Sequence, residues 1–233
     1  MGIDSGAEGG EHPDRENNPY QRDGLQGVVQ ALYNRVRPHL PRKMGVYNGV
    51  HARGPRLFDV SDVLPDYEDD LLGLVREAVD DGDHVTLVGG GLGISTIVAA
   101  RQGAASLTVY EPAADRARLV AENAALHDIQ RIEVHHAAVG DAANAAGPVA
   151  GADRIAPADL PDGDVLVLDC EGTEVDVITE MPNGYRAIVV ETHGALGTSK
   201  DDVHSALEAH DAEVLAVSED NPAAGIYTIL ARL

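Results

Sequence analysis

The stretch from His84 to Arg101 constrains the fold of this chain more than any other part of its sequence. Val85 to Val88 is apolar and β-prone, which predicts a buried strand. Ile94 to Ala100 has helical character. Between them lie four glycines: Gly89, Gly90, Gly91 and Gly93. Residues without a Cβ let the backbone turn sharply and approach a bound molecule, so this order predicts the opening unit of a doubly wound nucleotide-binding fold.

The spacing of these glycines separates two classes of nucleotide site. Dinucleotide-binding turns carry G-x-G-x-x-G, whose third glycine allows close packing of helix and strand. Ile94 and Thr96 stand at the two positions where that third glycine would be found. The observed pattern, Gly-x-Gly-x-Gly from residue 89, is similar to the first motif of class I S-adenosylmethionine (SAM) methyltransferases. A tight turn without a ligand is the alternative interpretation.

Composition sets the broad class of protein. The chain has 233 residues, 44% of them apolar, so it can bury one large α/β core, which must be built from Ala, Val, Leu and Ile because there is one Phe and no Trp. The one cysteine, Cys170, excludes an intramolecular disulfide and a multi-cysteine zinc site. We find no secretory signal and no run of eighteen apolar residues, and we therefore expect a cytoplasmic protein without membrane partners.

Charge is the strongest compositional feature. The sequence has 39 acidic and 17 basic residues, a formal net charge of −22, and its acids are spread along the chain. Such a surface repels itself in dilute buffer and is screened in concentrated salt, which predicts a halophilic source. An acidic protein from a non-halophilic source is the alternative. Binding to nucleic acid through phosphates is disfavoured, because it depends on Lys and Arg.

Three regions are predicted along the chain. Residues 1–24 are polar and acidic and predict a disordered tail. Residues 25–65 form an N-terminal helical or lid segment, with a helix over 27–40 and short strands within 44–58. Its arginines offset local acidity or bind an anionic group of a substrate. Residues 66–233 form the main domain.

Strands and helices alternate in the main domain. Strands are predicted at 85–88, 107–110, 132–136, 164–169 and 187–191, and helices at 66–80, 94–100, 113–126, 173–181 and 200–210. Residues 141–158 have no clear period and predict a loop with at most a short strand or helix. Two last strands, 213–217 and 226–230, predict an antiparallel hairpin. The expected fold is α/β, a doubly wound Rossmann-like sheet of about seven strands with a C-terminal antiparallel β-hairpin, whereas nicotinamide-binding folds end in further parallel units.

The segment Leu166-Val-Leu-Asp-Cys-Glu-Gly-Thr-Glu174 resembles the FkbM-type methyltransferases, class I SAM enzymes that are typically O-methyltransferases. Four residues match the family signature at the end of the fourth strand: Asp169, Glu171, Gly172 and Glu174. Residues 136–141 and 188–193 are similar to its segments after the third and fifth strands. The resemblance covers about residues 70–233. Leu87 departs from it, because the family usually has an acidic residue there that supports the amino-acid end of SAM.

The methionine, ribose and adenine groups of SAM each require a matching protein group, and the sequence offers a candidate for each. The glycine turn accommodates the methionine end. Glu111, at the end of the second strand, is placed to accept both ribose hydroxyls, or it is a carboxylate that stabilises a helix N-terminus. Asp141 is the candidate partner of the adenine amine, or a turn residue, with Ala138 and Val139 in apolar contact with the ring.

Methyl transfer needs alignment, and an alcohol acceptor must also lose a proton. Asp169 and Glu171 follow the fourth strand and Glu191 and His193 the fifth, so these side chains face the ligand crevice. We expect Asp169 or His193 to act as the base and Glu171 to position the acceptor; helix capping is the alternative for Asp169 and Glu171. These carboxylates with His193 can also bind a divalent ion, but we assign no metal ligand.

The sequence therefore predicts a SAM-dependent methyltransferase that O-methylates a hydroxyl of a small molecule or glycan, with SAM as cofactor and an oligomer possible. A non-catalytic nucleotide-binding or interaction protein of the same fold is one alternative. An NAD-dependent oxidoreductase is another, and methylation of RNA or protein a third. Fold-level similarity alone does not choose the acceptor.

Overall fold

The computed structural model describes residues 32, 34–59, 61–140 and 151–233. The predictions for residues 1–24 and for Asp141 lie outside this part of the chain. Two compact units are present. The described residues of the first are 32, 34–41 and 56–58, and the second comprises Arg42–Pro55 and Asp59–Leu233.

In the first unit, residues 32 and 34–36 are helical and the short 3₁₀ helix η2 (Arg37–His39) follows them. The guanidinium of Arg56 donates a hydrogen bond to the carbonyl oxygen of Leu40 at 2.8 Å. The N–H of Leu57 donates a hydrogen bond to the carbonyl oxygen of Pro41 at 2.9 Å. These bonds hold the two chain segments of the unit together. The described part of the predicted helix is therefore helical.

A small sheet opens the second unit, with strand order β2-β1-β3. Its strands are β1 (Arg42–Tyr47), β2 (Val50–Arg56) and β3 (Val63–Leu64). The buried side chain of Asn123 attaches β2 to the rest of the unit: it accepts the Arg53 N–H at 2.7 Å and donates to the carbonyls of Arg53 and Leu92 at 3.0 and 2.8 Å. Short strands in this region were predicted.

The main sheet has seven strands in the order β11-β12-β10-β9-β4-β5-β6. The five parallel strands are β4 (His84–Val88), β5 (Ser106–Tyr110), β6 (Ile132–His135), β9 (Val165–Leu168) and β10 (Ala187–Glu191). The antiparallel pair is β11 (Glu213–Asn221) and β12 (Ile226–Arg232). The predicted doubly wound sheet with a C-terminal hairpin is confirmed, although β11 continues four residues beyond its predicted end.

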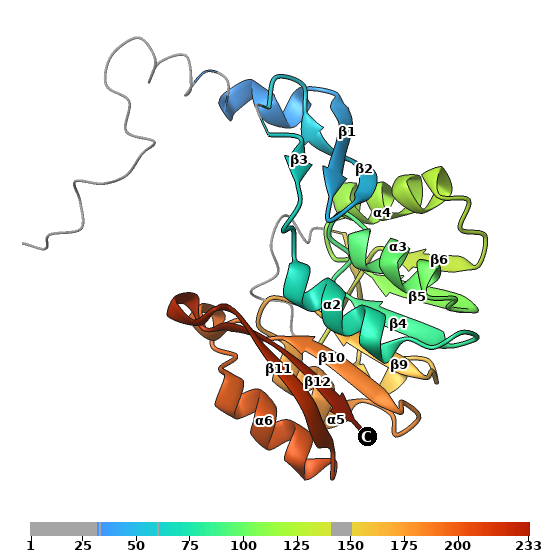
Figure 1. Ribbon diagram of the computed structural model, residues 1–233, viewed down its shortest axis with the longest axis vertical. Coiled ribbons are helices and arrows are strands. Elements are labelled where there is room, and N and C mark those ends of the chain that lie inside the picture. The colour runs from blue at the N-terminus through green and yellow to red at the C-terminus, as the bar shows by residue number, and fades with distance from the viewer. Residues whose placement is uncertain (1–31, 33, 60, 141–150) are drawn as a thin grey trace, which may run out of the picture. The chain divides into compact units, whose positions relative to one another are not determined.

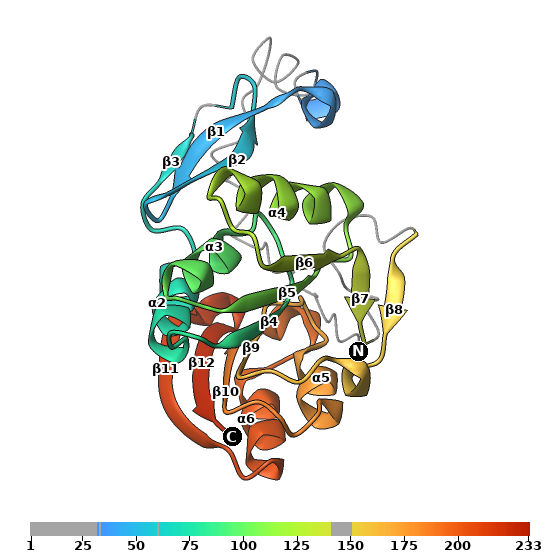
Figure 2. The same ribbon diagram turned by 90° about the vertical axis from the view of Figure 1, so that its right-hand side faces the viewer.

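Helices cover both faces of this sheet (Figures 1 and 2). One face carries α2 (Asp69–Ala78), α3 (Ile94–Arg101) and α4 (Ala114–Leu126), and the other α5 (Glu174–Glu180) and α6 (Lys200–Ala209). Side chains alternate along each strand, so Val165 and Val167 join the first core and Leu166 and Leu168 the second. No helix in the described part of the chain has the length and apolar character that a membrane crossing requires.

The segment after β6 differs from its prediction. The strand ends at His135, one residue before its predicted end, and a separate strand β7 (Ala137–Val139) pairs in parallel with β8 (Asp153–Ile155). The short strand β8 agrees with the expectation of at most a short strand or helix within 141–158. The 3₁₀ helix η4 (Pro157–Asp159) follows. The carbonyl of Glu111 accepts the N–H of Ala137 at 3.2 Å, and this bond turns the buried 137–139 segment past the end of β5.

Candidate active site

The glycine turn lies between β4 and α3, at the carboxyl edge of the parallel strands. Gly89 has φ +98°, and a Cβ there would lie 1.8 Å from the carbonyl oxygen of Asp169. Glycine at this position therefore lets the turn pass close to the end of β9. Gly91 has φ +52° and open space where its Cβ would be, while Gly90 and Gly93 face Val120 of α4.

Glu111 stabilises this turn by accepting hydrogen bonds from backbone N–H groups. One carboxylate oxygen accepts the N–H groups of Gly90 and Gly91 at 3.0 and 2.9 Å, and the other accepts the N–H of Ala113 at 2.8 Å. The residue is 2% exposed. A carboxylate has about four acceptor positions, so three backbone bonds leave room for about one more donor. The carboxylate thus serves the start of α4, as one of the two sequence interpretations has it, and binding of the ribose hydroxyls stays a prediction.

A hollow of about 470 Å³, including the solvent at its mouth, adjoins the turn. Several predicted site residues line it: Gly89, Gly91, Glu111, Ala138, Val139, Asp169 and Glu171. Gly90 and Gly93 shape the turn from behind. Seven further residues complete the lining, and the sequence assigned none of them to the site: Val88, Tyr110, Pro112, Arg116, Ala137, Cys170 and Thr173. An apolar wall from Ala137 to Val139 therefore faces polar groups contributed by β5 and β9.

The loop after β9 forms one rim of the hollow. Glu171 has φ +51°, and its carboxylate lies 3.9 Å from the guanidinium of Arg116. The alternative of helix capping fails, because Thr173 is the N-cap residue of α5 and no side chain caps it. Glu174 instead accepts the Gly172 N–H with both carboxylate oxygens, at 3.1 and 3.0 Å. Glu171 is therefore available to a ligand.

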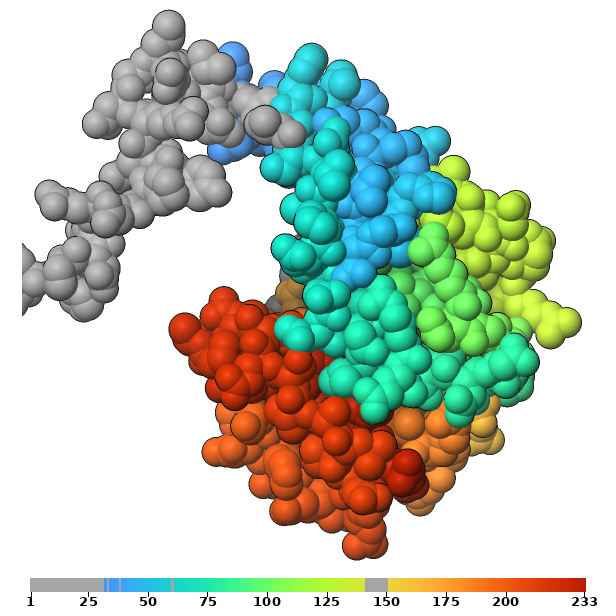
Figure 3. All heavy atoms as spheres, in the orientation of Figure 1, coloured from blue at the N-terminus to red at the C-terminus, as the bar shows by residue number. Residues whose placement is uncertain are grey.

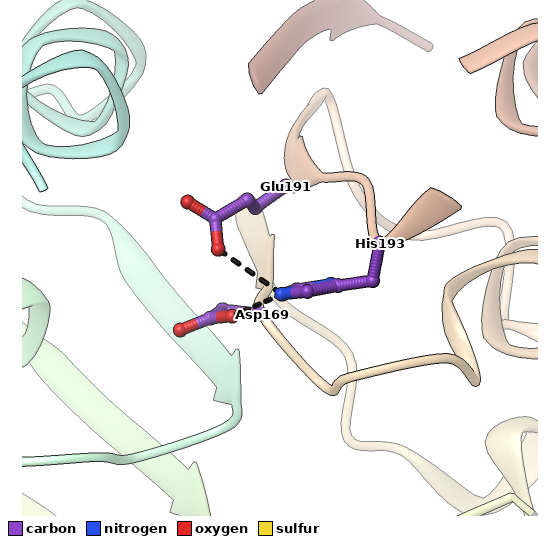
Figure 4. Close-up of side chains that lie close together, drawn as sticks. All are labelled: Asp169, Glu191 and His193. Carbon is purple, nitrogen blue, oxygen red and sulfur yellow. Dashed lines mark ion pairs between the residues drawn. The ribbon is translucent and has the colours of Figure 1, made fainter. Parts of the chain in front are cut away.

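Beside the hollow lies a group that we call the His193 cluster, which consists of Asp169, Glu174, Glu191 and His193. Figure 4 shows three of these residues, Asp169, Glu191 and His193. The Nδ1 atom of His193 lies 2.7 Å from a Glu174 oxygen. Its Nε2 atom lies 3.2 Å from a Glu191 oxygen and 3.5 Å from an Asp169 oxygen. Glu191 and His193 do not line the hollow, and Asp169 joins the cluster to it.

Electrostatics distinguishes the members of the cluster. Burial opposes a charge on His193, but its hydrogen bonds with Glu174 and Glu191 and the charge of Asp169 raise its pKa to about 10. Burial, together with the charges of Glu191 and Glu68, raises the pKa of Asp169 well above its usual range. An imidazolium has no free lone pair, so of these two groups Asp169, in its ionised form, is the one that can accept a proton.

Two further titratable residues, Glu68 and Tyr67, lie near the same cluster. Burial raises the pKa of Glu68 to about 7, with contributions from Glu191 and Asp220, and Glu68 itself has φ +45° before α2. Burial also raises the pKa of Tyr67. Neither residue follows a strand of the main sheet, and no sequence pattern marked them. Leu87, where the FkbM-type methyltransferases usually have an acid, is fully buried in the core.

Comparisons with known proteins show similarity at the level of structure. No protein-family model matches the chain, and no curated protein matches its sequence. A ribosomal protein L11 methylase from Lactobacillus delbrueckii is 15% identical, with a TM-score of 0.52, over 76% of this chain and 88% of that one. A protein assigned as a methyltransferase and solved with S-adenosylhomocysteine (SAH) is 9% identical, with a TM-score of 0.56, over 82% of this chain and 56% of that one.

The tRNA m1G37 methyltransferase of M. jannaschii is 14% identical, with a TM-score of 0.55, over 83% of this chain and 57% of that one. The chain thus spans little more than half the length of these last two proteins. Identities this low establish the fold alone. Together with the strand order and the antiparallel last pair, they show that the chain has the class I methyltransferase fold.

Proposed function

We propose that the chain is a SAM-dependent methyltransferase that binds its cofactor in the hollow beside the glycine turn. The observation that carries this proposal is the convergence of Gly89, Gly91 and Glu111 at one edge of the sheet. The hollow fits the cofactor: Gly91 leaves open space, Glu111 retains acceptor capacity, and residues 137–139 offer an apolar wall to an adenine. A structural neighbour solved with SAH supports the same cofactor.

When bound, SAM supplies a methyl group: its carbon–sulfur bond breaks with the electron pair left on sulfur, and an acceptor oxygen bonds to the carbon. The residues of this chain orient and deprotonate the acceptor. Asp169 lies where the hollow meets the His193 cluster and takes up the hydroxyl proton. Glu171 and Arg116 flank the acceptor at the rim. His193 holds the carboxylates of Asp169 and Glu191 in place.

For the acceptor we propose a hydroxyl of a small molecule or glycan. A buried carboxylate with a raised pKa suits the removal of a hydroxyl proton, and the FkbM-type motif around Asp169 supports O-methylation. Two structural neighbours are named for methylation of tRNA and of a ribosomal protein. The net charge of −22 argues against a nucleic-acid acceptor for this chain.

Calorimetric titration with SAH in concentrated KCl tests the cofactor assignment. We expect one site per chain with a micromolar Kd. Glu111→Gln weakens binding at least tenfold, since the variant loses a charged acceptor facing the turn, whereas Glu122→Gln, on the exposed side of α4, leaves it unchanged. A folded protein that does not bind SAH contradicts the proposal and favours the non-catalytic alternative.

Transfer of a labelled methyl group tests the acceptor. Hydroxylated small molecules, oligosaccharides and tRNA are offered separately. We expect label on a hydroxyl compound and its loss in Asp169→Asn with SAH affinity retained. Label on tRNA alone contradicts the proposed acceptor and leaves the cofactor assignment intact.

A further inference from the structure

The His193 cluster has a feature that proton transfer does not require. Asp169, Glu191 and His193 each present one ligand atom, and these three atoms all lie within 4.8 Å of one another. They come from the ends of β9 and β10 and point toward a common centre (Figure 4). We propose that Asp169, Glu191 and His193 bind one divalent transition-metal ion.

The distances suit such an ion. Bonds of about 2.1 Å from a metal to nitrogen or oxygen place neighbouring ligand atoms about 3.0 Å apart in octahedral and about 3.4 Å apart in tetrahedral sites. The Nε2 atom of His193 lies 3.2 Å from the Glu191 oxygen and 3.5 Å from the Asp169 oxygen. The two separations from His193 therefore match those of an ion-bound site, and the two carboxylate oxygens lie within 4.8 Å of one another.

The orientation of His193 is an independent observation. Glu174 is fully buried and accepts the Gly172 N–H, so its carboxylate is fixed as an acceptor for the Nδ1–H of His193. Nε2 then faces two carboxylate oxygens, which either an imidazolium proton or a metal ion between them would satisfy. Histidines that ligate metals commonly donate their other N–H to a carboxylate in this way. Glu174 is thus a positioning residue for the metal ligand.

The local charge also calls for a cation. In the described part of the chain, the ion pairs of Asp169, Glu174 and Glu191 are all made with His193, and none is made with a lysine or arginine. One imidazolium proton supplies a single positive charge to three carboxylates, and a divalent ion supplies two. One nitrogen and two oxygen donors favour Mn²⁺ or Zn²⁺ over Mg²⁺ and Ca²⁺. The sequence left a divalent ion open at these residues and assigned no metal ligand.

A role for the ion rests on the proposed function. Asp169 lines the hollow, so an ion held by its Oδ1 atom lies beside the place of methyl transfer. Three protein ligands leave coordination positions for water or for the hydroxyl of an acceptor. The ion would then orient that hydroxyl and favour loss of its proton to the second oxygen of Asp169.

Electron paramagnetic resonance with Mn²⁺ tests the site directly. The protein is freed of metals by a chelator and titrated in about 1 M KCl, which screens binding to the acidic surface. We expect one Mn²⁺ per chain and ¹⁴N modulation in the spin echo from His193. Asp169→Asn and Glu191→Gln weaken binding at least tenfold, and His193→Gln abolishes the ¹⁴N modulation. Glu180→Gln, an exposed acid of α5, is the matched control and binds like the wild type.

Mn²⁺ binding without ¹⁴N modulation, or binding that the cluster variants share with Glu180→Gln, overturns the inference. Circular dichroism shows whether each variant is folded. SAH calorimetry on the same samples separates the two proposals. Intact SAH binding with no metal site removes the inference alone, and a metal site without SAH binding removes the proposed function.

Discussion

Gly91 and Gly49 both adopt the left-handed backbone conformation, in two different parts of the molecule. Their φ angles are +52° and +73°, and neither has an atom within 4 Å of where a Cβ would lie. Alanine in this left-handed conformation costs about 1 kcal/mol at either site. Of these two glycines, Gly91 lines the hollow and Gly49 does not.

We therefore predict that Gly91→Ala and Gly49→Ala lower the Tm by similar amounts, but that Gly91→Ala alone weakens SAH binding, by tenfold or more. Calorimetry on the two variants measures this difference. Equal SAH affinities would show that the cofactor does not approach the turn.

At Gly89 the constraint is steric, because the backbone of Asp169 occupies the space that a side chain would need. A Cβ at Gly89 would lie 1.8 Å from the Asp169 carbonyl oxygen, so Gly89→Ala must displace the turn or the end of β9. We expect a loss of about 2 kcal/mol or more in the free energy of unfolding. Gly73→Ala, inside α2 with no atom within 4 Å, should gain about 0.5–1 kcal/mol. Urea unfolding measures both, and a neutral Gly89→Ala would contradict the close approach.

At the scale of elements, α2 and β11 adjoin on the face drawn in Figure 3 and share a pair of acids, Asp70 and Asp220. Burial and the hydrogen bond with Asp70 raise the pKa of Asp220 to about 6. Hydrogen bonds from Ser218 and Asp220 lower the pKa of Asp70. The pair therefore holds one proton in the folded state at pH values where the unfolded chain has released it.

A raised carboxyl pKa contributes stability that is fully present at low pH and is lost as the pH rises through about 6. We predict that the Tm of the wild type falls between pH 5 and pH 7 by more than that of Asp220→Asn. Glu219→Gln, its exposed neighbour on β11, should keep the wild-type profile. Parallel pH profiles for all three proteins would contradict a shared proton.

The elements of the main sheet could be predicted because each is signalled locally. The apolar run 165–168 and the glycines after Val88 need no knowledge of distant residues. The break at His136 could not be predicted, because it depends on pairing between β7 and β8 across residues 141–150. Glu68 and Arg116 escaped notice for the same reason: only the fold brings them to the carboxyl edge of the sheet.

At the scale of the whole molecule, the net charge of −22 is the dominant property. The Debye length falls from about 10 Å at 0.1 M salt to about 3 Å at 1 M, which screens repulsion between surface acids. We predict that the Tm rises by several degrees when KCl is raised from about 0.1 M to about 1 M. An equal concentration of a neutral osmolyte is the control for solvent exclusion. An unchanged Tm in KCl would contradict a halophilic origin.

The central claim is that SAM binds between the glycine turn and the 137–139 wall. A crystal structure of the SAH complex, grown in concentrated KCl, tests it most directly. We predict the ribose hydroxyls beside Glu111, the adenine against Ala138 and Val139, and the sulfur directed toward Asp169. SAH bound elsewhere, or a hollow that stays empty at saturating SAH, would contradict the account.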